Sequence, residues 1–301
     1  MAGHIVVVGS LNMDLVVRSP RHPQPGETLL GTEFHTFPGG KGANQAVAAA
    51  RLGGQVKLIG RVGADAFGAA LLQTLSQDGV DTRHVEPLKE APTGVALITV
   101  DDAGQNTIVV VPGANGELSP PDLLAAESAF EGASVVVMQL EVPVLTVTYA
   151  ADLARRHGAR VVLNPAPAQP LSAALLRQVD ALIPNQSEAA LLTGCALAGD
   201  AARRLLASGV RSVIVTLGED GVLIAEGETA THLPAHRVSV VDTTAAGDAF
   251  VGAFAVALAE GRTVHEAAAW GTAAGALAVT RAGAQPSLPA RAELEQFVRA
   301  R

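Results

Sequence analysis

Short apolar runs alternate with longer Ala- and Leu-rich stretches along most of the chain. The short runs are rich in β-branched residues and lack in–out alternation, which predicts strands covered on both faces. They span residues 5–8, 56–59, 135–138, 161–163, 181–183 and 212–216, and helical stretches lie between them at 43–52, 67–78, 144–157 and 200–208. This order predicts an α/β fold with a mostly parallel central sheet between two helical layers, a three-layer α/β/α sandwich.

One region departs from this alternation. Residues 93–100 and 106–111 are β-rich runs on either side of a turn-forming stretch, which predicts a β-hairpin. A further extended piece covers residues 15–18 and 28–37. We expect residues 15–37 and 93–111 to form a small β-sheet lid over one edge of the main sheet. The alternative is a hairpin that merely extends that edge. Because no repeat or linker interrupts the chain, we expect a single domain over residues 1–301.

The amino-acid composition argues against nucleic acids and membranes as partners. The chain carries 21 Lys and Arg against 29 Asp and Glu, and only 3% of its residues are aromatic. It therefore lacks the basic, stacking surface that nucleic acids require. The longest apolar helical stretches, 250–259 and 267–280, are shorter than the ~20 residues that cross a bilayer. A single cysteine, Cys195, permits no internal disulfide. We expect a cytoplasmic protein that binds neither nucleic acid nor membrane.

The turns that follow the strands are the places to search for chemistry, because ligands bind beyond the carboxyl ends of an open parallel sheet. The first such turn, residues 37–45, is a glycine cluster that runs into an Ala-rich helix and also offers Lys41 and Asn44. Glycines let the backbone approach a ligand, and a helix start offers free N–H donors. The spacing is that of neither a Walker A loop nor a Rossmann fingerprint. Taken alone, the segment is either a structural turn or a binding loop.

The second turn, residues 241–252, leads small residues into an apolar helix. The N–H groups of Ala245, Ala246 and Gly247 at the helix start would form an anion-holding concavity that suits a phosphate oxygen. Asp248 places a carboxylate beside this concavity. It is either a simple helix cap or a base that accepts a hydroxyl proton during phosphoryl transfer.

Weaker signals come from other strand ends. Asn185 and Glu188 could hold Mg²⁺ through water, or they could simply cap a helix. Residues 216–221 are either a nucleotide-contacting turn or an ordinary β-turn. Asp14, in a segment that closes the first predicted strand, could bind a polyol or cap the strand end. Glu141 follows a buried-looking run at the same edge of the sheet.

Together, these segments resemble the ribokinase-type (phosphofructokinase B) carbohydrate kinases. Residues 39–45 and 242–248 resemble the two signature segments of that family. Further similar motifs occur in the family's order at residues 12–14, 138–141, 164–168, 184–188 and 280–287. The resemblance covers essentially the whole chain, so it is far more specific than any single glycine cluster.

The resemblance implies a ribokinase-like sandwich with a lid that closes over a sugar, often in a homodimer joined through the lids. It implies ATP-dependent phosphorylation of D-ribose at the 5-hydroxyl, giving D-ribose 5-phosphate and ADP. In that reaction Asp248 would be the general base, and Ala245, Ala246 and Gly247 the anion hole. The implied sugar contacts are Asn12, Asp14, Gly40, Lys41, Gly42, Asn44, Glu141 and Asp248, and the implied nucleotide contacts are Asn185, Thr216, Gly218, Gly221 and Gly247.

The resemblance also implies two metal ions. Mg²⁺ would accompany ATP near Asn185 and Glu188, largely through water. K⁺ would act as a monovalent activator beside the anion hole. Its ligands would be Asp242 and oxygens, mostly backbone carbonyls, of Thr244, Ala278, Arg281, Gly283 and Ser287.

Other functions remain open at this point. A fructokinase, deoxyribokinase or nucleoside kinase belongs to the same class. The pairing of residues 12–14 with Glu141 favours a small free pentose, whereas a nucleoside would need an aromatic partner for its base. A non-catalytic sugar-binding protein would have lost the base, and the presence of Asp248 argues against it.

Overall fold

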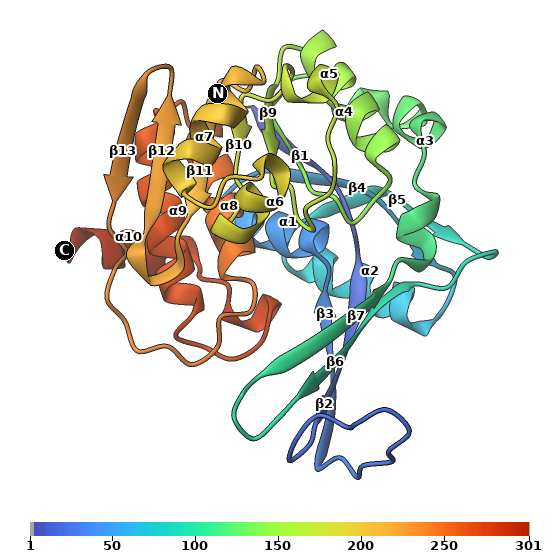
Figure 1. Ribbon diagram of the computed structural model, residues 1–301. Coiled ribbons are helices and arrows are strands. Elements are labelled where there is room, and N and C mark those ends of the chain that lie inside the picture. Colours follow the sequence, from blue (N-terminus) through green and yellow to red (C-terminus); the bar gives the residue numbers. More distant parts are fainter. Residues whose placement is uncertain (1–2, 301) are drawn as a thin grey trace.

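A nine-stranded sheet forms the centre of the computed structural model, which describes residues 3–300 (Figure 1). Its strands are β1 (His4–Val8), β4 (Val56–Gly63), β5 (Asp81–Leu88), β8 (Ala133–Met138), β9 (Arg160–Leu163), β10 (Ala181–Leu182), β11 (Ser212–Thr216), β12 (Val222–Glu226) and β13 (Thr229–Leu233). The order in space is β13-β12-β11-β10-β9-β8-β1-β4-β5. All pairs from β11 to β5 are parallel, whereas β12 and β13 add an antiparallel edge.

Helices cover both faces of this sheet, because alternate strand residues face two separate cores. Ile5 and Val7 of β1 belong to one buried apolar cluster, and Val6 and Val8 belong to the other. The first cluster is completed by α1 (Lys41–Arg51), α2 (Ala66–Gln77), α8 (Ala246–Ala259), α9 (Val264–Ala278) and α10 (Arg291–Arg299). The second is completed by α3 (Pro120–Ala125), α4 (Val144–Arg156), α5 (Ala173–Leu176), α6 (Gln186–Thr193) and α7 (Ala198–Ala207). The predicted three-layer sandwich is confirmed.

A second, four-stranded sheet projects from the main body and is seen at the bottom of Figure 1. It consists of β2 (Asn12–Arg18), β3 (Glu33–Gly39), β6 (Gly94–Val100) and β7 (Asn106–Val111), in the order β3-β2-β6-β7. We call it the lid sheet. The hairpin therefore does not extend an edge of the main sheet, where β5 and β13 lie, and that alternative was wrong. Strand β2 begins at Asn12 and strand β3 ends at Gly39, so both reach beyond the expected bounds of 15 and 37. Residues 28–32, which were expected to be extended, lie outside these strands.

Three strands of the main sheet were not predicted. β5 is mostly polar and carries Pro87 at the sheet edge, so it shows neither an apolar run nor a clean alternation. β12 and β13 form an antiparallel hairpin with an exposed outer strand. Short 3₁₀ turns complete the chain: η1 (Gly113–Glu117), η2 (Glu127–Ala129), η3 (Gly218–Asp220) and η4 (Gln285–Ser287).

The helices of the structure bear on the expectation that the chain does not cross a membrane. No helix within residues 3–300 combines the length and the apolar character that crossing a bilayer demands. Residues 1, 2 and 301 of the expected single domain lie outside the described part of the chain.

Candidate active site

The first glycine-rich segment joins lid strand β3 directly to helix α1. Gly40 lies between them with φ 88°, a left-handed conformation that favours glycine. A Cβ atom there would also lie 2.6 Å from the backbone nitrogen of Asn12. The helix begins at Lys41, two residues earlier than its predicted start at Ala43. Lys41, Gly42 and Asn44 therefore occupy its first turn and not a loop.

Asp248 lies in the first turn of α8 and is buried, with 6% of its surface exposed. Its Oδ2 accepts a hydrogen bond from Asn44 Nδ2 at 3.0 Å, and its Oδ1 accepts one from Gln45 Nε2 at 2.9 Å. The residue that caps α8 is Ala245, at φ 59° and without a side-chain bond. The interpretation of Asp248 as a helix cap was wrong, because its carboxylate is held by side chains of another helix.

Glu141 gathers groups from three segments at the carboxyl end of the sheet. Its Oε2 accepts hydrogen bonds from Ser10 Oγ (2.5 Å), from the Lys41 backbone N–H (3.1 Å) and from Asn12 Nδ2 (3.4 Å). Asn12 is oriented in turn by Asn115, whose Nδ2 donates to Asn12 Oδ1 at 2.8 Å. Glu141 thus links the end of β1, the start of the lid sheet and the start of α1.

Asp14 belongs to the lid sheet. Residues 12–14 open β2 and do not close β1, which ends at Val8, so the strand-end cap was the wrong interpretation. Burial, together with the nearby negative charges of Glu141 and Asp248, raises the pKa of Asp14 to about 7. Three carboxylates from three different elements therefore share one small volume.

Lys41 balances these carboxylates. Burial alone would lower the pKa of its ammonium group, but the charges of Asp248, Glu141 and Glu188 outweigh burial and raise that pKa. Lys41 therefore stays protonated and supplies a positive charge where the carboxylates meet. A cluster with one cation, several carboxylates and amide groups can hold the hydroxyls of a sugar and one phosphoryl group.

A cleft of about 870 Å³ lies beside this cluster. Four of the predicted nucleotide contacts line it: Thr216, Gly218, Gly221 and Gly247. The fifth, Asn185, does not line the cleft but pairs with Thr216 through an isolated parallel bridge. Other walls come from residues that the sequence did not single out, including Val238, Val240, Phe250, Thr272, Gly275 and Ala276. The volume matches that of pockets for drug-sized ligands.

Asn185 and Glu188 form a capping box at the start of α6. Asn185 Oδ1 accepts from the Glu188 N–H, and Glu188 Oε2 accepts from the Asn185 N–H, both at 2.8 Å. The cap interpretation is confirmed for this pair. Burial raises the pKa of Glu188, and the hydrogen bond from the Asn185 N–H and the charge of Lys41 only partly offset this rise. The charges of Lys41 and Asp248 therefore reach Glu188 from the cluster.

The residues predicted to hold K⁺ lie in two segments, 242–244 and 278–287, which a hydrogen bond between Asp242 and Gly283 joins. Asp242 Oδ1 accepts from the Thr244 N–H and its Oδ2 accepts from the Gly283 N–H, both at 2.8 Å. Burial would raise the pKa of Asp242, but these hydrogen bonds outweigh it and lower that pKa. The Ala278 carbonyl accepts the Arg281 N–H at 3.1 Å, and Ser287 Oγ donates to the Ala284 carbonyl at 2.8 Å.

The sequence can now be compared with known proteins. A sequence profile of the pfkB family carbohydrate kinases matches residues 2–291. The chain belongs to this family. It is 41% identical over 299 residues to the ribokinase of Haemophilus influenzae, with 98% of each chain covered. It is 38% identical over 299 residues to the deoxyribokinase of Salmonella typhi, with 97% of each covered.

A solved structure shows the same fold. The ribokinase of Arabidopsis thaliana, in a complex with ribose and ATP, superimposes with a TM-score of 0.90 at 34% identity, and the match covers 99% of both chains. The ribokinase-like sandwich with a small additional sheet is therefore the architecture of this pfkB family kinase.

Several polar residues of this pfkB family kinase were not predicted as site residues. Gln45, Gln139 and Asn164 form a chain of amides behind Asp248, and Ser10 and Asn115 hold Glu141 and Asn12. A signal was present for Gln139 and Ser10, since each lies within two residues of the end of an apolar strand. For Gln45, the only signal was its place inside the first glycine-rich motif.

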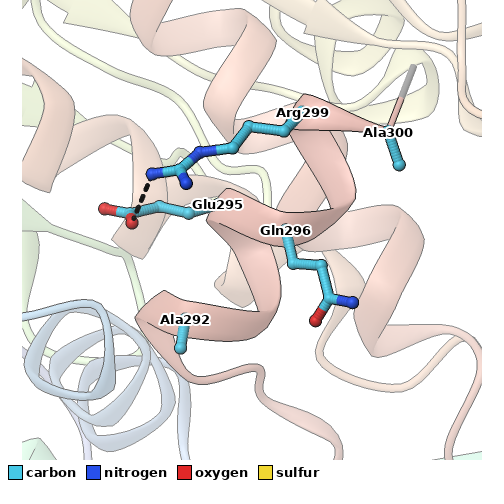
Figure 2. A pocket seen from close by; sticks show the side chains of 5 residues that line it. All are labelled: Ala292, Glu295, Gln296, Arg299 and Ala300. Atoms are coloured by element: carbon cyan, nitrogen blue, oxygen red, sulfur yellow. Dashed lines mark hydrogen bonds and ion pairs between the residues drawn. The ribbon is translucent and has the colours of Figure 1, made fainter.

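A second hollow of about 470 Å³ lies beside α10 of the kinase (Figure 2). Its walls are Ala292, Glu295, Gln296, Arg299 and Ala300. Arg299 forms an ion pair with Glu295 across 3.5 Å. The hollow contains none of the predicted site residues, so the cleft beside Asp248 is the candidate active site.

Proposed function

We propose that this pfkB family kinase transfers the γ-phosphoryl group of ATP to the 5-hydroxyl of D-ribose, giving D-ribose 5-phosphate and ADP. One observation carries the proposal. Gly247, which lines the large cleft, and Asp248, which joins the polar cluster, are consecutive residues in the first turn of α8. A nucleotide in the cleft and a sugar in the cluster would therefore meet at Asp248. The ribokinases among its relatives favour ribose as the sugar.

Asp248 serves as the general base in this proposal. As the 5-hydroxyl oxygen attacks the γ-phosphorus, Asp248 accepts its proton, a new oxygen–phosphorus bond forms, and the bond to the ADP oxygen breaks. The N–H groups of Ala245, Ala246 and Gly247, at the positive end of the α8 dipole, stabilise the charge on the phosphoryl group. The carboxylate is already buried and fixed by two amide donors, so little reorganisation is needed.

The sugar would be held by side chains of the polar cluster. Asn44 Oδ1 is buried and has no hydrogen-bond partner among the described residues, which suits a hydroxyl donor from a ligand. Asp14 and Glu141 add carboxylate acceptors on the lid side. The proposed sugar contacts are Asn12, Asp14, Gly40, Lys41, Gly42, Asn44 and Glu141, and the nucleotide contacts are Asn185, Thr216, Gly218, Gly221 and Gly247.

The proposal includes two ions. Mg²⁺ accompanies ATP in kinases of this type, where it neutralises phosphate charge. Asn185 and Glu188, at the start of α6, would hold its water shell. The proposed K⁺ ligands, Asp242, Thr244, Ala278, Arg281, Gly283 and Ser287, form two adjoining segments. We expect the turnover rate to fall several-fold when Na⁺ replaces K⁺, and an unchanged rate would remove K⁺ from the proposal.

The lid sheet would close over the sugar and join two copies of the chain. One face of this sheet exposes the apolar side chains of Phe34, Leu97, Val109 and Val111. Such a patch is typical of a surface that a partner covers. We propose a homodimer through the lid sheets, to be tested by the molar mass in solution. A cytoplasmic location stays a prediction.

A panel of sugars tests the substrate directly. Turnover with ATP and Mg²⁺ would be measured for ribose, 2-deoxyribose, fructose and adenosine. We expect the highest kcat/KM for ribose. A higher value for 2-deoxyribose would instead favour the activity named for the Salmonella typhi relative. Binding of ribose without turnover of any sugar would support a non-catalytic sugar-binding protein.

A further inference from the structure

We propose that Gln45 is a positioning residue that holds the Asp248 carboxylate in one orientation through a buried chain of amides. Gln45 Nε2 donates to Asp248 Oδ1 at 2.9 Å and to Asn164 Oδ1 at 3.1 Å. Its Oε1 accepts from Gln139 Nε2 at 2.6 Å. Gln45 and Gln139 are each at most 1% exposed. The inference rests on the proposed role of Asp248 as the base.

The direction of every amide in this chain follows from one backbone carbonyl. Asn164 Nδ2 donates to the carbonyl oxygen of Ile183 at 2.8 Å, and a carbonyl can only accept. Asn164 must therefore turn its Oδ1 toward Gln45, which in turn must present its Nε2. That same NH₂ group carries a second hydrogen, and this hydrogen is directed at Asp248 Oδ1. Gln45 cannot flip without breaking three hydrogen bonds.

The row of amides also determines the direction in which a proton accepted by Asp248 can leave. Behind Asp248 Oδ1 the hydrogen-bonded groups are amides, which neither accept nor release a proton near neutral pH. The proton taken from the sugar hydroxyl therefore leaves Asp248 toward the cleft and not through the protein interior.

Charged groups from three other elements also act on Asp248. They are Asp14 on β2, Lys41 on α1 and Glu188 on α6. A substitution at position 45 leaves all three groups in place, as well as the bond from Asn44. The effect of the amide donor can therefore be measured against a constant background.

The experiment compares Gln45→Met and Gln45→Glu with the unaltered enzyme. Methionine has a similar volume but no donor, so we expect kcat to fall about tenfold or more, with KM for the sugar within about threefold. The pH dependence of kcat should also change, because the Asp248 carboxylate keeps only one of its two amide donors. Glutamate places a second carboxylate against Asp248 and should lower kcat further.

A matched control and a milder variant complete the test. Gln178→Met removes a glutamine remote from Asp248 and should leave the pH profile unchanged. Gln139→Met removes only the far end of the amide chain, and it should lower kcat by a smaller factor than Gln45→Met. This variant keeps the proposal testable where Gln45→Met does not fold.

Distinct outcomes separate this inference from the proposed function. Unchanged kcat and an unchanged pH profile in Gln45→Met would overturn the positioning role, even where Asp248→Asn is inactive. Near-normal turnover of Asp248→Asn would overturn the proposed role of Asp248 as the base, and the absence of sugar phosphorylation by the unaltered protein would overturn the proposed function. A loss confined to KM or to the melting temperature would also contradict the positioning role, because a base held in the wrong orientation lowers kcat.

Discussion

The two halves of the candidate site recognise their ligands by different means. On the sugar side, charged and amide side chains converge from β2, α1, α8 and the segment after β8, and most of them are buried. On the nucleotide side, a cleft of about 870 Å³ is lined mainly by glycine, alanine and valine, and of the seven polar residues in its lining only Thr272 is buried. The sugar half depends on the identity of its side chains, whereas the nucleotide half depends on shape and on backbone groups.

This difference separates the expected effects of substitutions. Removing a functional group from the sugar half leaves buried partners unsatisfied, which is costly. Only one polar residue that lines the nucleotide half is buried, so a change of volume should disturb this half more than the removal of a polar group. Each of the following measurements can support or break this contrast.

The largest effect is expected at the junction of the two halves. Asp248→Asn keeps the shape of the side chain but removes the base, so we expect kcat to fall by about two or more orders of magnitude. Binding of the sugar, measured by calorimetry, should stay largely intact. A variant with near-normal turnover would show that the proton leaves by another route.

A substitution on the sugar side should come next. Glu141→Gln replaces a carboxylate that accepts from Ser10, Asn12 and the Lys41 N–H. We expect KM for ribose to rise about tenfold or more, since hydrogen bonds to a charged acceptor are the strong ones. KM for ATP should stay within about twofold. Equal increases in both KM values would contradict the division of the site.

A change of volume should act on the nucleotide side alone. Ala276→Leu fills part of the cleft wall on α9. We expect KM for ATP to rise about tenfold, consistent with the cost of overpacking, with no change in sugar binding. Ala292→Leu, in the hollow beside α10 shown in Figure 2, is the matched control and should change neither KM.

The smallest effect concerns stability and pH. Asp14 has a pKa of about 7 in the folded protein against an ordinary value of 3.8. The folded form therefore keeps the proton that the unfolded chain releases, and stability falls as pH rises from about 4 to about 7. Asp14→Asn removes this loss. We expect its gain in unfolding free energy to be roughly 1 kcal/mol larger at about pH 6 than at about pH 5, measured by denaturant titration.

The sequence predicted the fold well where local pattern decides it. Strands β1, β8, β9 and β11 are covered on both faces, so nearly all of their residues are apolar and the sequence pattern predicts them. Edge strand β5 is half-exposed and edge strand β13 is mostly exposed, so neither shows an apolar run in the sequence. The order and direction of β12 and β13 depend on packing that no local pattern encodes.

The site was predictable to a similar degree. Asp248, Lys41 and Glu141 could be predicted because they are charged residues at strand ends or helix starts, where ligands bind in an open parallel sheet. The amide chain did not, because Gln45 is separated from Asn164 by 119 positions and from Asp248 by 203. Glutamine and asparagine are common surface residues, so only the folded chain shows that these ones are buried and connected. The cleft walls were hidden for another reason, since Ala276 or Val240 resembles any core residue.

The junction at Gly40 has a consequence for enzyme engineering. Strand β3 ends at Gly39 and helix α1 begins at Lys41, so one residue connects the lid sheet to the helix that carries Asn44 and Gln45. A lid transplanted from another kinase to alter its choice of sugar would have to preserve this splice point. A graft that introduced any other amino acid at position 40 would strain the junction and displace the amides that aim the base. Substitutions that alter the choice of sugar are therefore safer within the lid strands than at Gly40, where the lid sheet joins α1.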